Sequence, residues 1–111
     1  MAAKNSITTE ITEEEFNHII NNSHELVIVD FFAEWCMPCL ILSPIIDELA
    51  EKFNKAKFVR INVDDNEELS SKHQILSIPC LVFFKKGKEV DRLIGNQPSE
   101  DIEERIAKHL E

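Results

Sequence analysis

The chain has 111 residues and a formal charge of −9, because 21 acidic residues outnumber 12 lysines and arginines. This length suits one domain with one hydrophobic core, so residues 1–111 are expected to form a single domain. The acidic balance opposes binding to nucleic acid and to anionic membranes. Since no apolar run is long enough to span a bilayer and no secretory signal pattern opens the chain, a cytoplasmic protein is expected.

The first half of the chain predicts two strands and two helices. A short edge strand is expected around residues 6–11, and Thr12 with Glu15 forms the capping-box pattern that begins a helix. The buried stripe of that helix is expected to be Phe16, Ile19 and Ile20. Residues 26–32 are apolar at almost every position, as in a central parallel strand that is buried on both faces. A long amphipathic helix is expected to follow over about residues 40–53.

The second half of the chain predicts three strands and two helices. They are a strand over residues 58–63, a short helix ending near residue 72, strands over residues 80–84 and 90–94, and a last helix opening at residues 98–99. Asp64-Asp65-Asn66 is expected to cap the short helix, and Gly87 to supply the turn between the last two strands. The resulting order predicts an α/β fold, with a central mixed sheet of about five strands flanked by about four helices.

The most informative motif is Trp35-Cys36-Met37-Pro38-Cys39, at the junction between the apolar strand and the long helix. Two cysteines at this spacing can close a disulfide without unwinding the helix. The first one also lies at the positive end of the helix dipole, which favours its thiolate. In a strand–helix setting, Cys-x-x-Cys indicates a redox dithiol rather than half of a zinc site.

Two plainer interpretations of this pair are open: two buried small hydrophobic residues, or a metal half-site. A tetrahedral zinc needs four ligands, and only Cys80 and scattered histidines are left to complete such a set. The histidines lack ligand spacing and are expected at the surface; they are His18, His24, His73 and His109. Three cysteines are also too few for a disulfide scaffold.

Asp30 lies in the middle of an otherwise apolar strand. Burying an ionised carboxylate is costly, so the pKa of Asp30 is expected to rise above its ordinary value. The alternative is an aspartate that reaches solvent, or caps, at the end of a strand.

Motifs spread over nearly the whole chain resemble the thioredoxin family. The matching segments are Val29-Asp30-Phe31-Phe32-Ala33-Glu34-Trp35-Cys36, Pro38-Cys39, Pro44, Asn62-Val63-Asp64, Ile78-Pro79, Phe84-Lys85-Lys86-Gly87 and Gly95. Cys-x-x-Cys alone would be weak, but its combination with the preceding Asp-Phe-Phe-Ala-Glu-Trp and the distant Ile-Pro is specific. The resemblance implies the thioredoxin fold, with Ile78-Pro79 as a cis-proline loop that lies against the dithiol.

The resemblance also implies a role for each reactive group. Cys36, placed before the body of the helix, is the candidate nucleophile that attacks a client disulfide, and Cys39 would then resolve the mixed disulfide. Asp30 would act as general base and acid for Cys39. Arg60 stands where the family usually has a lysine; it would either hold Asp30 more ionised or point to solvent, and both remain open.

An apolar rim for docking of client peptides is expected around the dithiol, formed by Trp35, Met37, Pro38, Ile78, Pro79 and Gly95. Core packing is the plain alternative for Trp35, and a turn glycine is the plain alternative for Gly95. Pro38 stiffens the loop between the cysteines. The Met-Pro pair between the cysteines, which lacks a histidine, favours a reductant over an oxidant.

Three residues depart from the family pattern. Met37 replaces a glycine and places a flexible apolar side chain beside Cys36. Leu40 replaces a lysine, which should leave the Cys36 thiolate slightly less favoured or change the docking of acidic partners. Cys80 replaces a threonine after the predicted cis-proline. It is either a buried strand thiol or a third sulfur, able to pair with Cys36 or to help hold a metal or an iron–sulfur cluster.

The expected function is therefore reduction of protein disulfides by a cytoplasmic thiol–disulfide oxidoreductase that cycles between dithiol and disulfide. The expected partners are client disulfides and an external electron donor such as a thioredoxin reductase. Neither a bound cofactor nor a metal nor an oligomer is required. The alternatives are a disulfide oxidase or isomerase, and a non-catalytic binding module that presents the same rim.

Overall fold

The structure is a computed structural model that describes residues 8–110. Its elements are β1 (Thr9–Glu10), α2 (Glu13–Asn22), β2 (Val27–Phe32), α3 (Met37–Lys52), β3 (Lys57–Asn62), α4 (Glu67–Lys72), β4 (Cys80–Lys85), β5 (Lys88–Ile94) and α5 (Ser99–Leu110). The predicted order of strands and helices is confirmed. The predicted edge strand is wrong in extent, because within the described residues only Thr9–Glu10 form it; residues 6–7 lie outside them.

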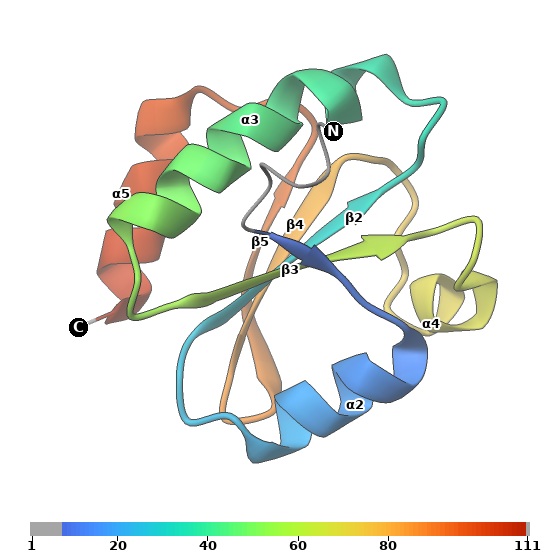
Figure 1. Ribbon diagram of the computed structural model, residues 1–111, viewed down its shortest axis with the longest axis horizontal. Coiled ribbons are helices and arrows are strands. Elements are labelled where there is room, and N and C mark those ends of the chain that lie inside the picture. Colours follow the sequence, from blue (N-terminus) through green and yellow to red (C-terminus); the bar gives the residue numbers. More distant parts are fainter. Residues whose placement is uncertain (1–7, 111) are drawn as a thin grey trace.

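The five strands form one mixed sheet in the order β1-β3-β2-β4-β5. β2 runs parallel to β3 and antiparallel to β4, which in turn is antiparallel to β5. The carboxyl ends of β2 and β3 and the amino end of β4 therefore share one edge of the sheet, where the loop into α3 also begins (Figure 1). This edge brings together segments that are far apart in the sequence.

Helices cover both faces of the sheet, α2 and α4 on one and α3 with α5 on the other (Figure 1). The side chains of β2 alternate between these two layers. Val27, Val29 and Phe31 pack with Phe16, Ile20 and Leu69 on the α2/α4 face. Ile28 packs with Leu42, Ile46, Ile102 and Ile106 on the α3/α5 face. Both faces of this strand are buried, as its sequence predicts.

The predicted start of the long helix is wrong. The helix begins at Met37 rather than near Leu40, with Cys36 as its N-cap residue. A proline is tolerated in the first turn because the first backbone N–H groups of a helix have no partner inside it, so Pro38 does not delay the helix. The second cysteine therefore already lies within the first turn.

The capping predictions have different outcomes. Thr12 and Glu15 form the predicted capping box, with hydrogen bonds of 2.8 and 3.2 Å. The predicted side-chain cap of α4 is wrong: Asn66 holds the N-cap position, but its amide donates to the carbonyl of Asn62 at 3.0 Å and makes no capping bond. Gly87 has a φ of +81° and supplies the predicted turn between β4 and β5.

Candidate active site

Cys36 and Cys39 are joined by a disulfide at the start of α3, with their Cα atoms 5.2 Å apart. The sulfur of Cys36 also accepts a hydrogen bond from the backbone N–H of Cys39 at 3.2 Å. Cys36 is 4% exposed and Cys39 is 1% exposed. The order of exposure agrees with the assignment of Cys36 as the outer sulfur, although both residues are buried in the disulfide form.

Apolar side chains pack around the disulfide. Phe32 and Ala33, which end and follow β2, form a buried cluster with the two cysteines, and Val63 and Ile78 pack against it. The backbone N–H groups at the start of α3 favour a thiolate on Cys36, and one of them, that of Cys39, already donates a hydrogen bond to its sulfur.

The Ile78–Pro79 peptide bond is cis, as the resemblance implies. Its loop meets the dithiol through Ile78, which packs against the cluster around the two cysteines. The carbonyl of Pro79 accepts a hydrogen bond of 2.8 Å from the backbone N–H of Gly95, whose φ is +80°. Ile78, Pro79 and Gly95 therefore lie together beside the disulfide.

The remaining rim residues lie at the surface. Trp35 is 71% exposed, and its indole N–H donates to a carboxylate oxygen of Asp64 at 2.8 Å, so core packing of this residue is wrong. Met37 and Pro38 are exposed at the start of α3. These side chains are free to meet a polypeptide that approaches the disulfide.

Asp30 is 1% exposed in the middle of β2, so an aspartate that reaches solvent at a strand end is wrong. By alternation its side chain lies on the same face of the sheet as Ile28 and Phe32, the latter a neighbour of both cysteines. Burial raises the pKa of Asp30 from 3.8 to about 7, against the lowering effect of Arg60 and with a further rise from Asp47. The expected rise is confirmed, and the carboxyl exchanges its proton near neutral pH.

Arg60 faces the interior rather than solvent. Its Nε lies 3.7 Å from Oδ2 of Asp30, and its guanidinium carbon lies 4.1 Å from the centre of the Phe32 ring. At that distance the charges attract without a hydrogen bond, and within the described part of the chain neither carboxylate oxygen of Asp30 has a hydrogen-bond partner. Arg60 therefore lowers the pKa of Asp30 but does not overcome the effect of burial.

Cys80 is a free thiol that is 1% exposed, directly after Pro79. It packs with Phe31, Val82 and Phe84 on the α2/α4 face, whereas the redox pair packs on the opposite face of β2. Burial raises the pKa of the Cys80 thiol, which disfavours its reactive thiolate. Residues 8–110 contain no group of three or more Cys, His, Asp or Glu placed to hold a metal. The buried strand thiol is the interpretation that agrees with this environment.

The histidine prediction is partly wrong. His18 and His24 are exposed, but His73 and His109 are half-buried. His73 lies edge-on against the rings of Phe16 and Phe84. Nε2 of His109 lies 2.9 Å from Oδ2 of Asp91.

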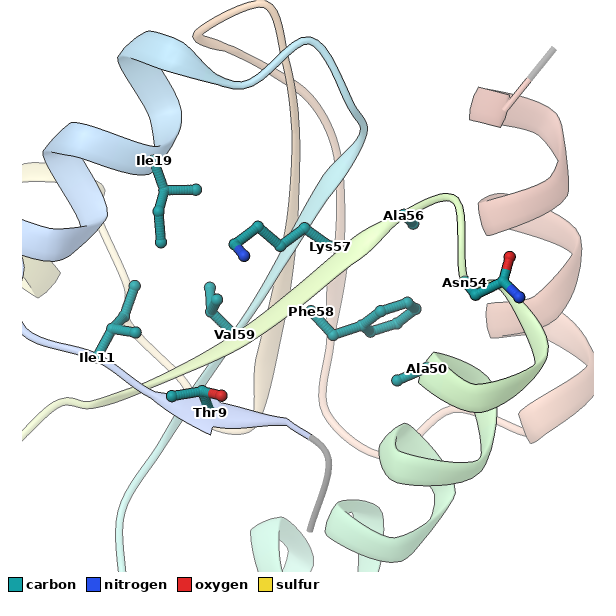
Figure 2. Close-up of a pocket in the computed structure, with 9 residues that line it drawn as sticks. All are labelled: Thr9, Ile11, Ile19, Ala50, Asn54, Ala56, Lys57, Phe58 and Val59. Atoms are coloured by element: carbon teal, nitrogen blue, oxygen red, sulfur yellow. The ribbon is translucent and has the colours of Figure 1, made fainter.

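Figure 2 shows the residues that line a cavity of about 400 Å³ at the sheet edge, and neither cysteine of the dithiol is among them. Its lining consists of Thr9, Ile11, Ile19, Ala50, Asn54, Ala56, Lys57, Phe58 and Val59. Lys57 carries the only charge among them, and none of the predicted site residues belongs to the set. This lining contains no cysteine, histidine or carboxylate, so it has no group for thiol–disulfide exchange.

Three exposed apolar side chains near the dithiol were missed by the sequence reasoning, and a fourth, Leu40, was noted only as a departure from the family pattern. Leu40 and Ile41 are exposed in the first turns of α3, by 49% and 56%. Leu76 and Ile94, exposed by 93% and 53%, flank the cis-proline segment and Gly95 in sequence. The signal for Leu40 and Ile41 was their position in a helix expected to be amphipathic, which leaves part of its surface to solvent. The sequence carried no comparable signal for Leu76.

The described part of the chain contains no helix with the length and apolar character needed to cross a membrane. The family model for thioredoxin matches residues 7–108. Thioredoxin 1 of Nostoc sp. is 37% identical, over 95% of this chain and 99% of the relative. Thioredoxin of Staphylococcus epidermidis is 39% identical, over 90% and 95%.

The solved structure of a thioredoxin from Nicotiana alata is 29% identical and superposes with a TM-score of 0.89, over 96% of this chain and 95% of that one. The Trp-Cys-x-Pro-Cys motif, the Cys36–Cys39 pair and the five-stranded mixed sheet fit this family. The chain therefore belongs to the thioredoxin family and is a thiol–disulfide oxidoreductase that reduces protein disulfides.

Proposed function

We propose that Cys36, Cys39 and Asp30 carry out this reduction as nucleophile, resolving thiol and proton acceptor. The observation that carries the proposal is a disulfide at the start of α3 with a buried carboxyl on the same face of the sheet, whose pKa is about 7. Such a carboxyl takes and returns a proton at neutral pH with little driving force lost in either direction.

In the first step the Cys36 thiolate attacks one sulfur of a client disulfide. A bond forms between that sulfur and Cys36 while the client S–S bond breaks, and the other client sulfur leaves as a thiolate that takes a proton from water. The N-terminus of α3 stabilises the attacking thiolate through its backbone N–H groups.

In the second step Cys39 attacks the sulfur of Cys36. The Cys39 thiol gives its proton to ionised Asp30, the Cys36–Cys39 disulfide forms, and the second client sulfur leaves as a thiolate that is then protonated. In sum, two electrons and two protons pass from the dithiol to the client. An external dithiol donor, such as a thioredoxin reductase, restores the reduced pair.

The client chain would dock on the rim that surrounds the disulfide. Trp35, Met37 and Pro38 are exposed on one side of it, and Ile78, Pro79 and Gly95 lie on the other. Pro38 fixes one backbone angle between the cysteines and so keeps the loop in shape as the disulfide opens and closes.

We further propose that residues 1–111 act as a single domain, as a monomer in the cytoplasm. The dithiol needs no residue from a second copy to complete the steps above. The high acidic charge keeps copies apart.

Reduction of insulin by dithiothreitol, followed as turbidity, tests the proposal. The wild-type chain should accelerate it, and Cys36→Ser should not. The Cys39→Ser variant should instead accumulate client proteins on Cys36 as mixed disulfides, because the resolving thiol is missing. Failure to capture any client on Cys36 would contradict the proposed mechanism.

Two alternative functions predict different experimental results. An oxidase or isomerase would refold a scrambled disulfide protein faster than it reduces insulin. A binding module would keep its partner after both Cys36 and Cys39 are replaced by serine.

A further inference from the structure

Leu76 is 93% exposed, in the loop between α4 and β4. A single exposed leucine is ordinary, but this one borders a hollow of about 500 Å³ that a second exposed aliphatic side chain, Ile94, also lines. The full lining is Gln74, Leu76, Ser77, Cys80, Arg92 and Ile94. We call this hollow the Leu76 hollow.

The Leu76 hollow is continuous with the edge of the sheet where the disulfide lies. Ser77 directly precedes Ile78, which packs against the cluster of Cys36 and Cys39. Cys80 and Ile94 are partners in the ladder between β4 and β5, and the next residue, Gly95, is hydrogen-bonded to Pro79. The loop from α4 runs to this same edge of the sheet (Figure 1). A polypeptide that docks at the disulfide can therefore extend into the Leu76 hollow.

The chemistry of the Leu76 hollow suits an apolar side chain rather than an anion. Arg92 is the only charged residue in its lining, and the positive charge of the guanidinium is already paired with a carboxylate. It makes two hydrogen bonds of 2.8 Å to the carboxylate of Glu89 and further bonds to the backbone carbonyls of Gln74 and His73. The thiol of Cys80 is kept neutral by its burial. Leu76 and Ile94 remain as the exposed groups that gain most from being covered.

We propose that the Leu76 hollow receives a large apolar side chain of the client polypeptide, close in sequence to the client's reactive cysteine. The inference rests on the proposed function and names its substrate class: disulfides flanked by leucine, isoleucine, methionine or phenylalanine. A client fits better than a second copy of this chain because two copies, each with a charge of −9, repel one another. The hollow also adjoins the disulfide, which a client must reach and a second copy of this chain need not.

The test uses peptides of serine and glycine with one cysteine, which is joined as a mixed disulfide to a fluorescent thiol. A single leucine is placed at each of the positions before and after the cysteine in turn, and a leucine-free peptide serves as reference. The wild-type protein should reduce the best leucine peptide about tenfold faster in kcat/KM than the reference, the lower end of what a pocket gains from added methylenes.

Two variants separate the Leu76 hollow from general hydrophobicity. In Leu76→Ser the preference, taken within that variant as the kcat/KM for the best leucine peptide divided by the kcat/KM for the leucine-free peptide, should fall to about twofold or less. Val90→Ser is the matched control, because Val90 is also an exposed aliphatic residue of β5, 40% exposed, but lies near the turn at the opposite end of the strand from Ile94 and does not line the Leu76 hollow. It should keep the full preference.

Equal rates on all peptides, or equal preference in Leu76→Ser and wild type, would overturn the inference while leaving the proposed function intact. A dimer in sedimentation equilibrium that Leu76→Ser dissolves would assign the Leu76 hollow to a second copy and also overturn it. Failure of the wild-type protein to reduce any peptide would instead contradict the proposed function, and the inference with it.

Discussion

Cys39 and Cys80 are both 1% exposed and both lie at the same edge of the sheet, yet their surroundings on the two faces differ. Cys39 lies on the α3 face, with a second cysteine in bonding distance and Asp30 on the same face of β2. Cys80 lies on the α2/α4 face among Phe31, Val82 and Phe84. Burial is thus the same for both thiols, and the difference in chemistry comes from what each face places beside the sulfur.

The largest expected effect separates these two cysteines directly. Cys39→Ser should lower turnover in insulin reduction by at least about 10³-fold, because the mixed disulfide on Cys36 is no longer resolved. Cys80→Ser should leave turnover within about twofold, since that sulfur takes no part in the exchange. If Cys80→Ser also lost most of its activity, or if mass spectrometry after mild oxidation found Cys80 crosslinked to Cys36, the contrast between the faces would fail.

Asp30→Asn removes the proton acceptor from the α3 face, while the asparagine keeps the shape of the aspartate side chain. We expect turnover near pH 7 to fall roughly 10²-fold, because an amide cannot accept the proton of the Cys39 thiol. In the wild type the rate of the resolving step should rise with pH as Asp30 ionises around its pKa of about 7, and this rise should be absent in the variant. Stopped-flow measurement of the release of the second client thiol between pH 5 and 9 checks both expectations.

The same carboxyl should make folding stability depend on pH in an unusual direction. The pKa of Asp30 is 3.8 ordinarily and about 7 in the folded protein, so the unfolded chain loses its proton first as the pH rises. Wild type should therefore lose stability relative to Asp30→Asn between about pH 4 and pH 7, by up to about 4 kcal/mol, with no further change above. Urea denaturation of both proteins at pH 4 and pH 8 measures this difference. A constant difference would show that Asp30 does not titrate in this range.

Much of this fold follows from the sequence because its signals are local. Residues 26–32 are apolar on both faces, and this alone predicts a central strand. The Thr12–Glu15 capping box predicts the start of its helix. The errors also have physical causes. Pro38 resembles a helix breaker but lies in the first turn, where its missing N–H costs nothing. Asn66 resembles a cap, but its side-chain amide donates to the backbone carbonyl of Asn62 and its oxygen accepts no capping hydrogen bond.

The properties of the candidate site that depend on residue type could be predicted from the sequence. Those that depend on where a side chain points were harder to predict. A carboxylate in an apolar strand predicts a raised pKa for Asp30, and the structure agrees. The sequence does not decide whether the side chain of Arg60 points to solvent or to Asp30, because a long side chain on a strand can reach either solvent or a neighbouring strand. His73 and His109 carry no pattern in sequence that distinguishes them from His18 and His24; their contacts come from β4, β5 and α2.

Arg60 sharpens the comparison, because it is the cation that the α3 face offers to Asp30, 3.7 Å away. Arg60→Met should raise the pKa of Asp30 further, since the attraction that lowers it is lost while burial remains. The pH at which the resolving step reaches half its maximum should move upward, and turnover at pH 7 should fall by about fivefold. Arg60→Lys keeps the charge and should restore most of the rate; a profile that does not move in Arg60→Met would mean that the pair is not coupled.

Leu40→Lys should give the smallest effect. The side chain of Leu40 is 49% exposed one residue beyond Cys39, in the first turn of α3. A lysine there adds a positive charge near the Cys36 thiolate, but water screens an exposed charge, so the pKa of the Cys36 thiol should fall by only about half a unit or less. Alkylation of the reduced protein by iodoacetamide as a function of pH measures this pKa. Glu51→Gln, at an exposed residue far along the same helix, makes the net charge one unit more positive, as Leu40→Lys does, and serves as the control for net charge. A larger shift in Leu40→Lys would mean that the start of α3 is less screened than its exposure indicates, and that side-chain charge contributes there together with the backbone N–H groups.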